Sequence, residues 1–133
     1  MQMSFGTLEL AERLKRDNIL MKIDALIDWE ELRPKLRGLY KRELSHGGGQ
    51  EPFDALMMFK AILLGQWHSL SDAALEQALS VRIDFLQFCG LSLSDAIPDE
   101  TTLCRFRNRL VSGDRLDDLL ASINEQLQSH GSV

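Results

Sequence analysis

The stretch from Ala55 to Trp67 constrains the fold most, because apolar side chains occur on nearly every side of a helix built from it. Its apolar residues include Leu56, Met57, Met58, Phe59, Ile62, Leu63, Leu64 and Trp67. A helix that is apolar all round must be buried among other elements. Lys60, Gly65 and Gln66 interrupt the stretch, which is also too short to span a bilayer. The sequence therefore predicts a central helix enclosed by others and no membrane partner.

The length and charge of the chain limit what surrounds this helix. A chain of 133 residues is enough for one domain with a sizeable core. Fifteen Lys and Arg face twenty Asp and Glu, which gives a net charge of −5. An acidic chain is not a general binder of polyanions, so any contact with nucleic acid must come from a local basic face.

Helical signals continue along most of the chain. The prolines Pro34, Pro52 and Pro98 lie near expected boundaries, and β-branched residues do not alternate over a strand length. We expect helices over residues 7–14, 19–27, 55–67, 72–79, 83–89, 100–111 and 115–130, and a short or kinked one after Asp28. Expected caps are Asp28 with Glu31 in a capping box, Asp54, Ser71, Asp99 and Asp114, with Gly90 and Gly113 as stops. The predicted fold is all-α, a compact bundle of about six to seven helices with a helix-turn-helix-like C-terminal half.

A glycine run divides this series of helices. Gly47, Gly48 and Gly49 have no strand before them and no Gly-Lys-Ser/Thr after them, so they do not predict a phosphate-binding loop. We interpret them as a flexible joint. The expected organisation is an N-terminal helical arm (1–46), a Gly-rich loop (47–51) and a main helical bundle (52–133) that contains a candidate DNA-reading helix (99–111).

The helix expected over residues 99–111 has two chemically different sides. With Leu103 placed at zero and about one hundred degrees per residue, Phe106 and Leu110 fall within about sixty degrees of it. The opposite side carries the polar residues Thr101, Arg105, Asn108, Arg109 and Ser112. Arg107 falls at the edge of the buried side, where we expect it to brace the fold. The pattern predicts a buried apolar stripe and a basic outer face within an acidic chain.

The outer face carries side chains that can contact DNA. Arginine can pair with both major-groove acceptors of guanine, and asparagine can do the same with adenine. We therefore expect Arg105, Asn108 and Arg109 at bases or phosphates. Thr101 and Thr102 are expected at the DNA backbone, because N–H groups at a helix N-terminus favour phosphate. A solvated amphipathic helix whose arginines lie along its surface is the alternative that spacing leaves open.

Two further basic features are candidates for phosphate contact. Lys60 lies on the apolar surface between Leu56 and Trp67, where it must pair with an acid, extend to solvent or reach a ligand. Pairing with an acid is the favoured interpretation, and a phosphate contact is the functional one. The run of cations that begins at Arg33 includes Arg37, Lys41 and Arg42. This run is either a solvated face or a second patch that tracks backbone phosphates.

The spacing of Cys and His gives no support for metal or nucleophilic chemistry. Cys89 and Cys104 do not make a disulfide framework, and we expect them as reduced thiols in the cytosol. His46, His68 and His130 have no ligand spacing with one another or with the cysteines. We therefore expect no metal, no cofactor and no catalytic residue in this chain.

Several short motifs follow one another at a specific spacing. They are Pro52-Phe53-Asp54, Met58-Phe59-Lys60-Ala61 with Leu63-Leu64, Leu70-Ser71-Asp72 with Leu75-Glu76 and Ala78-Leu79, Phe85 with Phe88 and Gly90-Leu91, and Pro98-Asp99 with Thr101-Thr102-Leu103, Arg105-Phe106-Arg107 and Leu110. In this order they resemble the N-terminal domain of bacterial insertion-sequence transposases of the InsH-like group, family five. The resemblance runs from about Ile27 to the end of the chain.

The resemblance implies a DNA-binding and assembly domain that recognises the terminal inverted repeats of its element. In this family a separate ribonuclease-H-like domain carries the Asp, Asp and Glu that hold Mg²⁺ for strand cleavage and joining. The chain ends at Val133, before the strand that carries the first of these carboxylates. We therefore expect no enzyme activity and no Mg²⁺ in this chain. The expected location is the cytoplasm, in association with the nucleoid.

A protein–protein dimerisation module without DNA binding is the alternative. The last expected helix has an apolar stripe of Leu116, Leu120, Ile123 and Leu127, which could pair with a second copy. Packing within the chain explains the same stripe. The sequence leaves open the target DNA, the oligomeric state and whether the chain is a truncated gene product or a complete small binder.

Overall fold

A computed structural model describes residues 18–39 and 53–130 of the chain. Those residues form helices joined by short turns and loops, with no strand among them, so the all-α prediction is confirmed. In chain order the elements are α2 (Ile19–Leu26), the 3-10 helix η1 (Trp29–Leu32), α3 (Arg33–Leu36), α5 (Ala55–Trp67), α6 (Asp72–Val81), α7 (Ile83–Cys89), α8 (Glu100–Ser112) and α9 (Leu116–Ser129). The helix expected over residues 7–14 and the glycine run lie outside the described residues.

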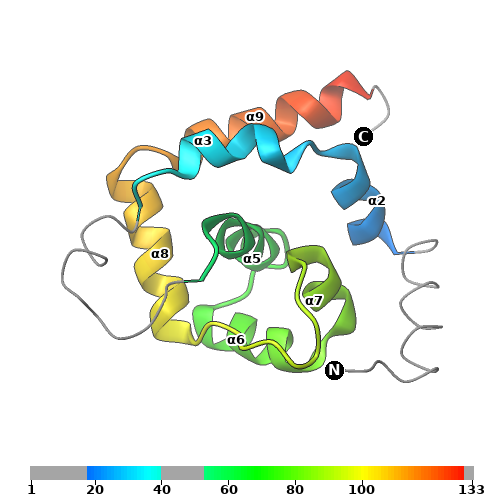
Figure 1. Ribbon diagram of the computed structural model, residues 1–133, viewed down its shortest axis with the longest axis vertical. Helices are drawn as coiled ribbons and strands as arrows, with labels where there is room; N and C mark the ends of the chain where they lie inside the picture. Colours follow the sequence, from blue (N-terminus) through cyan, green and yellow to red (C-terminus); the bar gives the residue numbers. More distant parts are fainter. Residues whose placement is uncertain (1–17, 40–52, 131–133) are drawn as a thin grey trace.

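Helix α5 is the centre of the structure. Figure 1 shows it near the middle of the molecule, with the other described helices around it. Every residue from Leu56 to Gly65 is buried. Gly65 allows the next helix to approach closely, because a Cβ at this position would lie 3.1 Å from a methyl group of Leu75 on α6. The enclosed central helix predicted from the sequence is therefore confirmed.

Most of the helix caps predicted from the sequence form in the structure. Asp54 accepts a hydrogen bond from the N–H of the third residue of α5, and Ser71 and Asp99 do the same for α6 and α8. Each cap satisfies a backbone donor that has no partner within its own helix. Gly90 ends α7 with a φ of 76°, in the left-handed region that glycine adopts at little cost.

The capping box expected at Asp28 is wrong. The Asp28 side chain makes no cap hydrogen bond, and the carboxylate of Glu31 accepts a hydrogen bond from Gln126 of α9 at 3.1 Å. The Gln126 amide also pairs with both backbone groups of Asp28, at 2.6 Å to the N–H and 3.3 Å to the carbonyl. The segment forms one 3-10 turn and then a single α-turn with Pro34 near its start, which confirms a short helix here.

The cap expected at Asp114 is also wrong. Helix α9 begins at Leu116 with Arg115 in the cap position and no side-chain cap. Asp114 instead completes the end of α8. It has a φ of 55°, its N–H donates to the carbonyl of Val111, and the Arg115 N–H donates to that of Leu110. This is the hydrogen-bond pattern of a Schellman motif, with Asp114 in the left-handed position.

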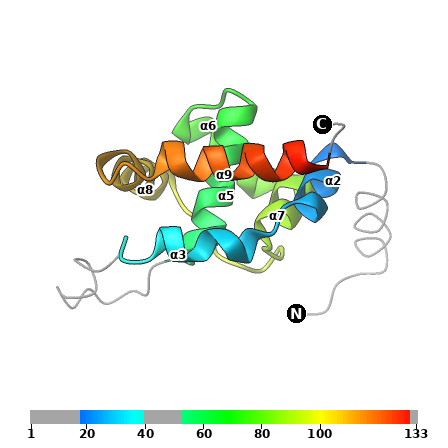
Figure 2. The same ribbon diagram turned by 90° about the horizontal axis from the view of Figure 1, so that it is seen from above.

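Residues 18–39, which fall within the expected N-terminal arm, contribute to the same core as the rest. The buried side chains from this segment are Leu20, Met21, Ile27, Leu32 and Leu36. Helix α2 packs on α7 and α9, and α3 packs on α5. Figures 1 and 2 place α2 and α8 at opposite ends of the molecule. No helix in the described ranges is long and apolar enough to cross a membrane.

Candidate nucleic-acid interface

Helix α8 is held in the core by one side. Leu103, Phe106 and Leu110 are fully buried, as the sequence pattern predicts. Their spacing places them on a single stripe, and burying three large apolar side chains fixes which face of the helix looks inward. Because one side of α8 is fixed in the core, the opposite side faces outward.

The outward side of α8 carries a polar stripe, made of Thr101, Arg105, Asn108 and Ser112. All four residues are exposed. Successive members are four, three and four positions apart, so they lie along one line of the helix surface. Arg109 flanks this stripe and is half-buried. Of the five polar residues that the sequence placed on this side, the structure leaves four exposed together.

The N-terminus of α8 is occupied by carboxylates. Asp99 accepts a hydrogen bond from the N–H of Thr102 at 2.8 Å, and Glu76 of α6 accepts one from the N–H of Glu100 at 2.8 Å. The Thr102 backbone N–H is the main cause of the lowered pKa of Asp99. The amides that were expected to face phosphate next to Thr101 and Thr102 therefore include two that already hold an anionic group.

Arg107 is engaged with α6 rather than directed outward. Its two terminal nitrogens donate to the two carboxylate oxygens of Asp72, one of them at 2.8 Å. This hydrogen bonding raises the pKa of Arg107, so the guanidinium is charged at all ordinary pH values. Two-point pairing of this kind fixes orientation as well as distance. The structure thus gives Arg107 a partner that sequence spacing did not identify.

Lys60 lies in the interior and has an acid as its partner. It is 8% exposed, and its Nζ donates to Oδ1 of Asp24 at 2.8 Å. The ammonium also lies 4.4 Å from the ring centre of Trp29 and 5.0 Å from that of Phe88, at cation–π distances. The Trp29 Nε1 donates to the same Asp24 oxygen at 2.7 Å. Pairing with an acid is the interpretation that the sequence favours, and the buried ammonium of Lys60 does not belong to the exposed face of α8.

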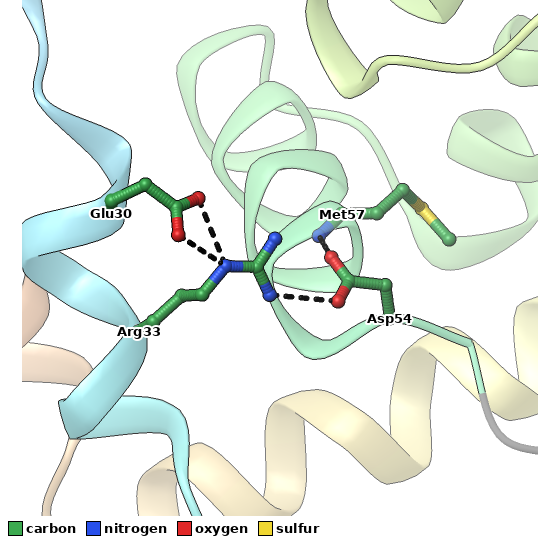
Figure 3. Close-up of polar contacts among 4 residues, drawn as sticks. All are labelled: Glu30, Arg33, Asp54 and Met57. Carbon is green, nitrogen blue, oxygen red and sulfur yellow. Dashed lines mark hydrogen bonds and ion pairs between the residues drawn. The ribbon is translucent and has the colours of Figure 1, made fainter.

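The cations of the basic run that begins at Arg33 make different contacts. Arg33 donates to Glu30 at 2.8 Å and to Asp54 at 2.9 Å, as Figure 3 shows. Lys35 pairs with Asp118 of α9 at 3.0 Å. Arg37 is exposed, whereas Lys41 and Arg42 lie outside the described residues. Of the three candidates Arg37, Lys41 and Arg42, only Arg37 is among the described residues, and it lies on the surface.

Arg37 lies next to the turn between α8 and α9. The guanidinium of Arg115, the first residue after that turn, donates to the backbone carbonyls of Lys35 and Arg37. A Cβ added at Gly38 would lie 3.9 Å from the same guanidinium. The basic run and the candidate helix, which the sequence separated by a flexible joint, are therefore brought together at the C-terminal end of α8.

The Arg33–Asp54 contact makes stability depend on pH. Partial burial raises the pKa of Asp54, but its hydrogen bonds from Arg33 and from the Met57 N–H lower it by more, so the net pKa lies below the ordinary 3.8. A carboxyl group with a lowered folded-state pKa contributes stability above its unfolded pKa, and this stability is lost as the pH falls through the folded value.

We expect Asp54→Asn to lower the thermal midpoint at pH 7, because asparagine keeps the helix cap but not the charge. The gap from the wild type should begin to close as the pH falls through 3.8, the ordinary value for this carboxyl group, and should narrow further as the pH approaches the lower folded-state pKa of Asp54. Circular dichroism melts between pH 7 and about pH 3 measure this. Glu125→Gln, at an exposed position on α9, serves as the control. A gap that stays constant over this range would contradict the assignment.

The two histidines among the described residues lie close to backbone carbonyls. His68 caps the end of α5 with its Nδ1 3.0 Å from the carbonyl of Leu64, and His130 lies 3.2 Å from that of Leu26. Cys89 and Cys104 are both free thiols, and burial raises the pKa of Cys89 to about 12. Within residues 18–39 and 53–130, no group of His, Cys, Asp and Glu could hold a metal ion.

Fold and surface together define an all-α domain that presents one polar helix face from a fixed core. Sequence comparison adds a family to this description. The chain matches the family described as a transposase domain (DUF772) over residues 8–109, and it belongs to that family. No solved structure matches the chain.

Proposed function

We propose that the chain is the DNA-binding and assembly domain of an insertion-sequence transposase of the InsH-like group, family five, and that it recognises the terminal inverted repeats of its element. The observation that carries this proposal is the exposed stripe of Thr101, Arg105, Asn108 and Ser112 on α8. Membership of a transposase-domain family supports the setting. A net negative chain that exposes Arg and Asn along one helix face has the local surface that DNA binding needs.

The middle and C-terminal turns of α8 make the contact in this proposal. Arg105 and Asn108 are exposed and carry the side chains that pair with guanine and adenine edges. The carboxylates of Asp99, Glu100 and Glu76 at the other end of the helix would repel phosphate. Arg37, beside the α8–α9 turn, is then placed to contact the DNA backbone next to the groove.

The chemistry of strand cleavage and joining belongs to a separate domain in this proposal. The catalytic carboxylates of the family and the Mg²⁺ they hold would lie in that domain, and this chain would act in the bacterial cytoplasm as the DNA-recognition unit. Transposition by such a protein depends on DNA recognition and catalysis together, so loss of α8 contacts should abolish it without touching a catalytic residue.

The double variant Arg105→Ala with Asn108→Ala tests the assignment. We expect its affinity for a duplex carrying the terminal inverted repeat to fall at least tenfold, since each good base contact contributes about 1–3 kcal/mol. The slope of binding against salt should change by less than about one, because in this proposal Arg105 contacts a base edge and does not neutralise a phosphate. Fluorescence anisotropy titrations at several salt concentrations measure both quantities.

A matched control removes one exposed cation and one exposed amide elsewhere. Lys22→Ala with Asn124→Ala does this on α2 and α9, and α2 lies at the opposite end of the molecule from α8. The control should bind as the wild type does. Equal binding by the Arg105/Asn108 variant and the wild type, with both folded by circular dichroism, would reject the role of α8.

Part of the apolar stripe on which the dimerisation alternative depends is used within the chain. Leu119 and Ile123 of α9 are buried, and Leu116, Leu120 and Leu127 pack against the core of the same chain. Side chains that pack within one chain offer less apolar surface to a second copy. The proposal therefore gives α9 a role in the core of the domain and assigns DNA binding to α8.

A further inference from the structure

Helix α6 contacts α8 through two carboxylates placed one helical turn apart. Glu76 accepts the backbone N–H of Glu100, the first residue of α8, at 2.8 Å. Asp72 accepts both terminal nitrogens of Arg107. The side chains of Asp72 and Arg107 are 20% and 38% exposed, so solvent screens this ion pair only partly. Both contacts come from the same face of α6, because residues four apart are neighbours on a helix.

The two anchor points on α8 also share one face. Glu100 and Arg107 are seven residues apart, which is two turns and about 20° of rotation. They are separated by about 10 Å along the helix axis. The exposed stripe around Arg105 and Asn108 lies roughly 80–160° around the helix from this face. The buried stripe sets which side of α8 faces inward, and these two contacts on one side add a finer restraint on its rotation and its axial position without themselves lying on the outward face.

We propose that Asp72 and Glu76 are positioning residues that set the orientation of α8 against DNA, with the Asp72–Arg107 pair fixing the rotation at which Arg105 and Asn108 meet the base edges. The proposal rests on the proposed function. In it, α6 acts as a rigid support for the reading helix. Specificity for the repeat sequence then depends on residues that do not touch DNA.

The direction of the change in DNA binding distinguishes a positioning role of Asp72 from a simple effect of its charge. Removal of an acidic charge near a DNA-binding face strengthens binding to every DNA sequence, because the repulsion from phosphates falls. Loss of a positioning contact instead weakens the discrimination between sequences, because base contacts depend on geometry whereas phosphate contacts tolerate displacement. A general loss of folded protein lowers both affinities by the same factor and leaves their ratio unchanged.

The experiment compares Asp72→Asn, Arg107→Gln and the double variant. Each is titrated with a duplex carrying the terminal inverted repeat and with an unrelated duplex of the same length and composition. We expect the affinity ratio to fall about fivefold in each single variant, which is the order of one weakened base contact. The double variant should show about the same loss, because both substitutions remove one shared interaction.

Asp117→Asn is the matched control for charge. It removes the same negative charge as Asp72→Asn from an exposed position on α9 that takes no part in the α6–α8 contact, so the affinity ratio should be retained. Hydrogen exchange without DNA gives an independent measurement. Amides of α8 should exchange faster in Asp72→Asn than in the wild type, relative to the amides of α5 in the same sample.

Several results would overturn the proposal. Unchanged exchange in α8 would show that the pair does not hold the helix. An unchanged ratio in Asp72→Asn with a reduced ratio in Arg107→Gln would make Arg107 a direct DNA contact. A wild-type chain that does not prefer the repeat would remove the proposed function and this role together, whereas a preference kept by Asp72→Asn would remove this role alone.

Discussion

Replacement of Asp24 by alanine should lower the free energy of unfolding by about 3 kcal/mol, which is the lower end expected when one partner of a buried ion pair is removed. The substitution leaves the ammonium of Lys60, which is 8% exposed, without its carboxylate. It also removes the nearer of the two acceptors of the Trp29 indole N–H, which keeps the backbone carbonyl of residue 24 at 3.2 Å. The contacts with the Trp29 and Phe88 rings remain, but a ring face does not replace a carboxylate in a site with little water.

Lys60→Met is the informative partner of this variant. It removes the buried charge and keeps most of the apolar volume, so we expect a loss of about 1 kcal/mol or less. Asp24 then keeps its hydrogen bond from Trp29, and its side chain is 30% exposed to water. Urea denaturation followed by circular dichroism measures both variants. A larger loss in Lys60→Met than in Asp24→Ala would show that the aromatic contacts of the ammonium outweigh its ion pair.

Phe106→Ala should lower the free energy of unfolding by about 3–5 kcal/mol, as expected for a large side chain removed from a well-packed core. Phe106 is fully buried and belongs to the stripe that attaches α8 to the rest of the molecule. Because the same stripe determines which side of α8 faces outward, DNA binding should fall in parallel with the folded fraction. Guanidinium denaturation combined with the anisotropy titration measures both effects.

Val111→Ala on the same helix is the control for this variant. Val111 is 54% exposed, so its truncation should change stability by no more than about 0.5 kcal/mol. The two substitutions share a helix and differ in the burial of the side chain that they shorten. A loss from Val111→Ala similar to that from Phe106→Ala would mean that side-chain burial does not decide how α8 is held, because alanine is the better helix former in both substitutions and propensity alone predicts no loss.

The helices and their ends could be predicted because their causes are local. An all-round apolar pattern predicts burial of Ala55–Trp67 whatever surrounds it, and caps such as Asp54 and Asp99 act on N–H groups only three residues away. The two cap predictions are wrong because another part of the structure engages each residue. Asp28 pairs through its backbone with a side chain from α9, and Asp114 completes the end of α8 instead of starting α9.

For the candidate site, the sequence predicts the role of a side chain but not the residue that it contacts. The sequence places Arg107 at the edge of a buried face, where it is expected to brace the fold, and Lys60 on an apolar surface, where it is expected to pair with an acid. Which acid depends on packing between helices, since Asp72 lies 35 residues from Arg107 and Asp24 lies 36 residues from Lys60. The cap that Glu76 supplies to another helix has no signal in the sequence beyond a carboxylate on a neighbouring element.

The enclosure of α5 also limits how this family can change over time. A helix with a solvent side can accept polar substitutions there, but the run from Leu56 to Gly65 has no such side. A change in volume at one of these positions creates a gap or an overlap that only a neighbour can correct. Gly65 and Leu75, which already face each other across α5 and α6, are an example. Homologous sequences should therefore vary at these positions in volume-compensating pairs rather than singly.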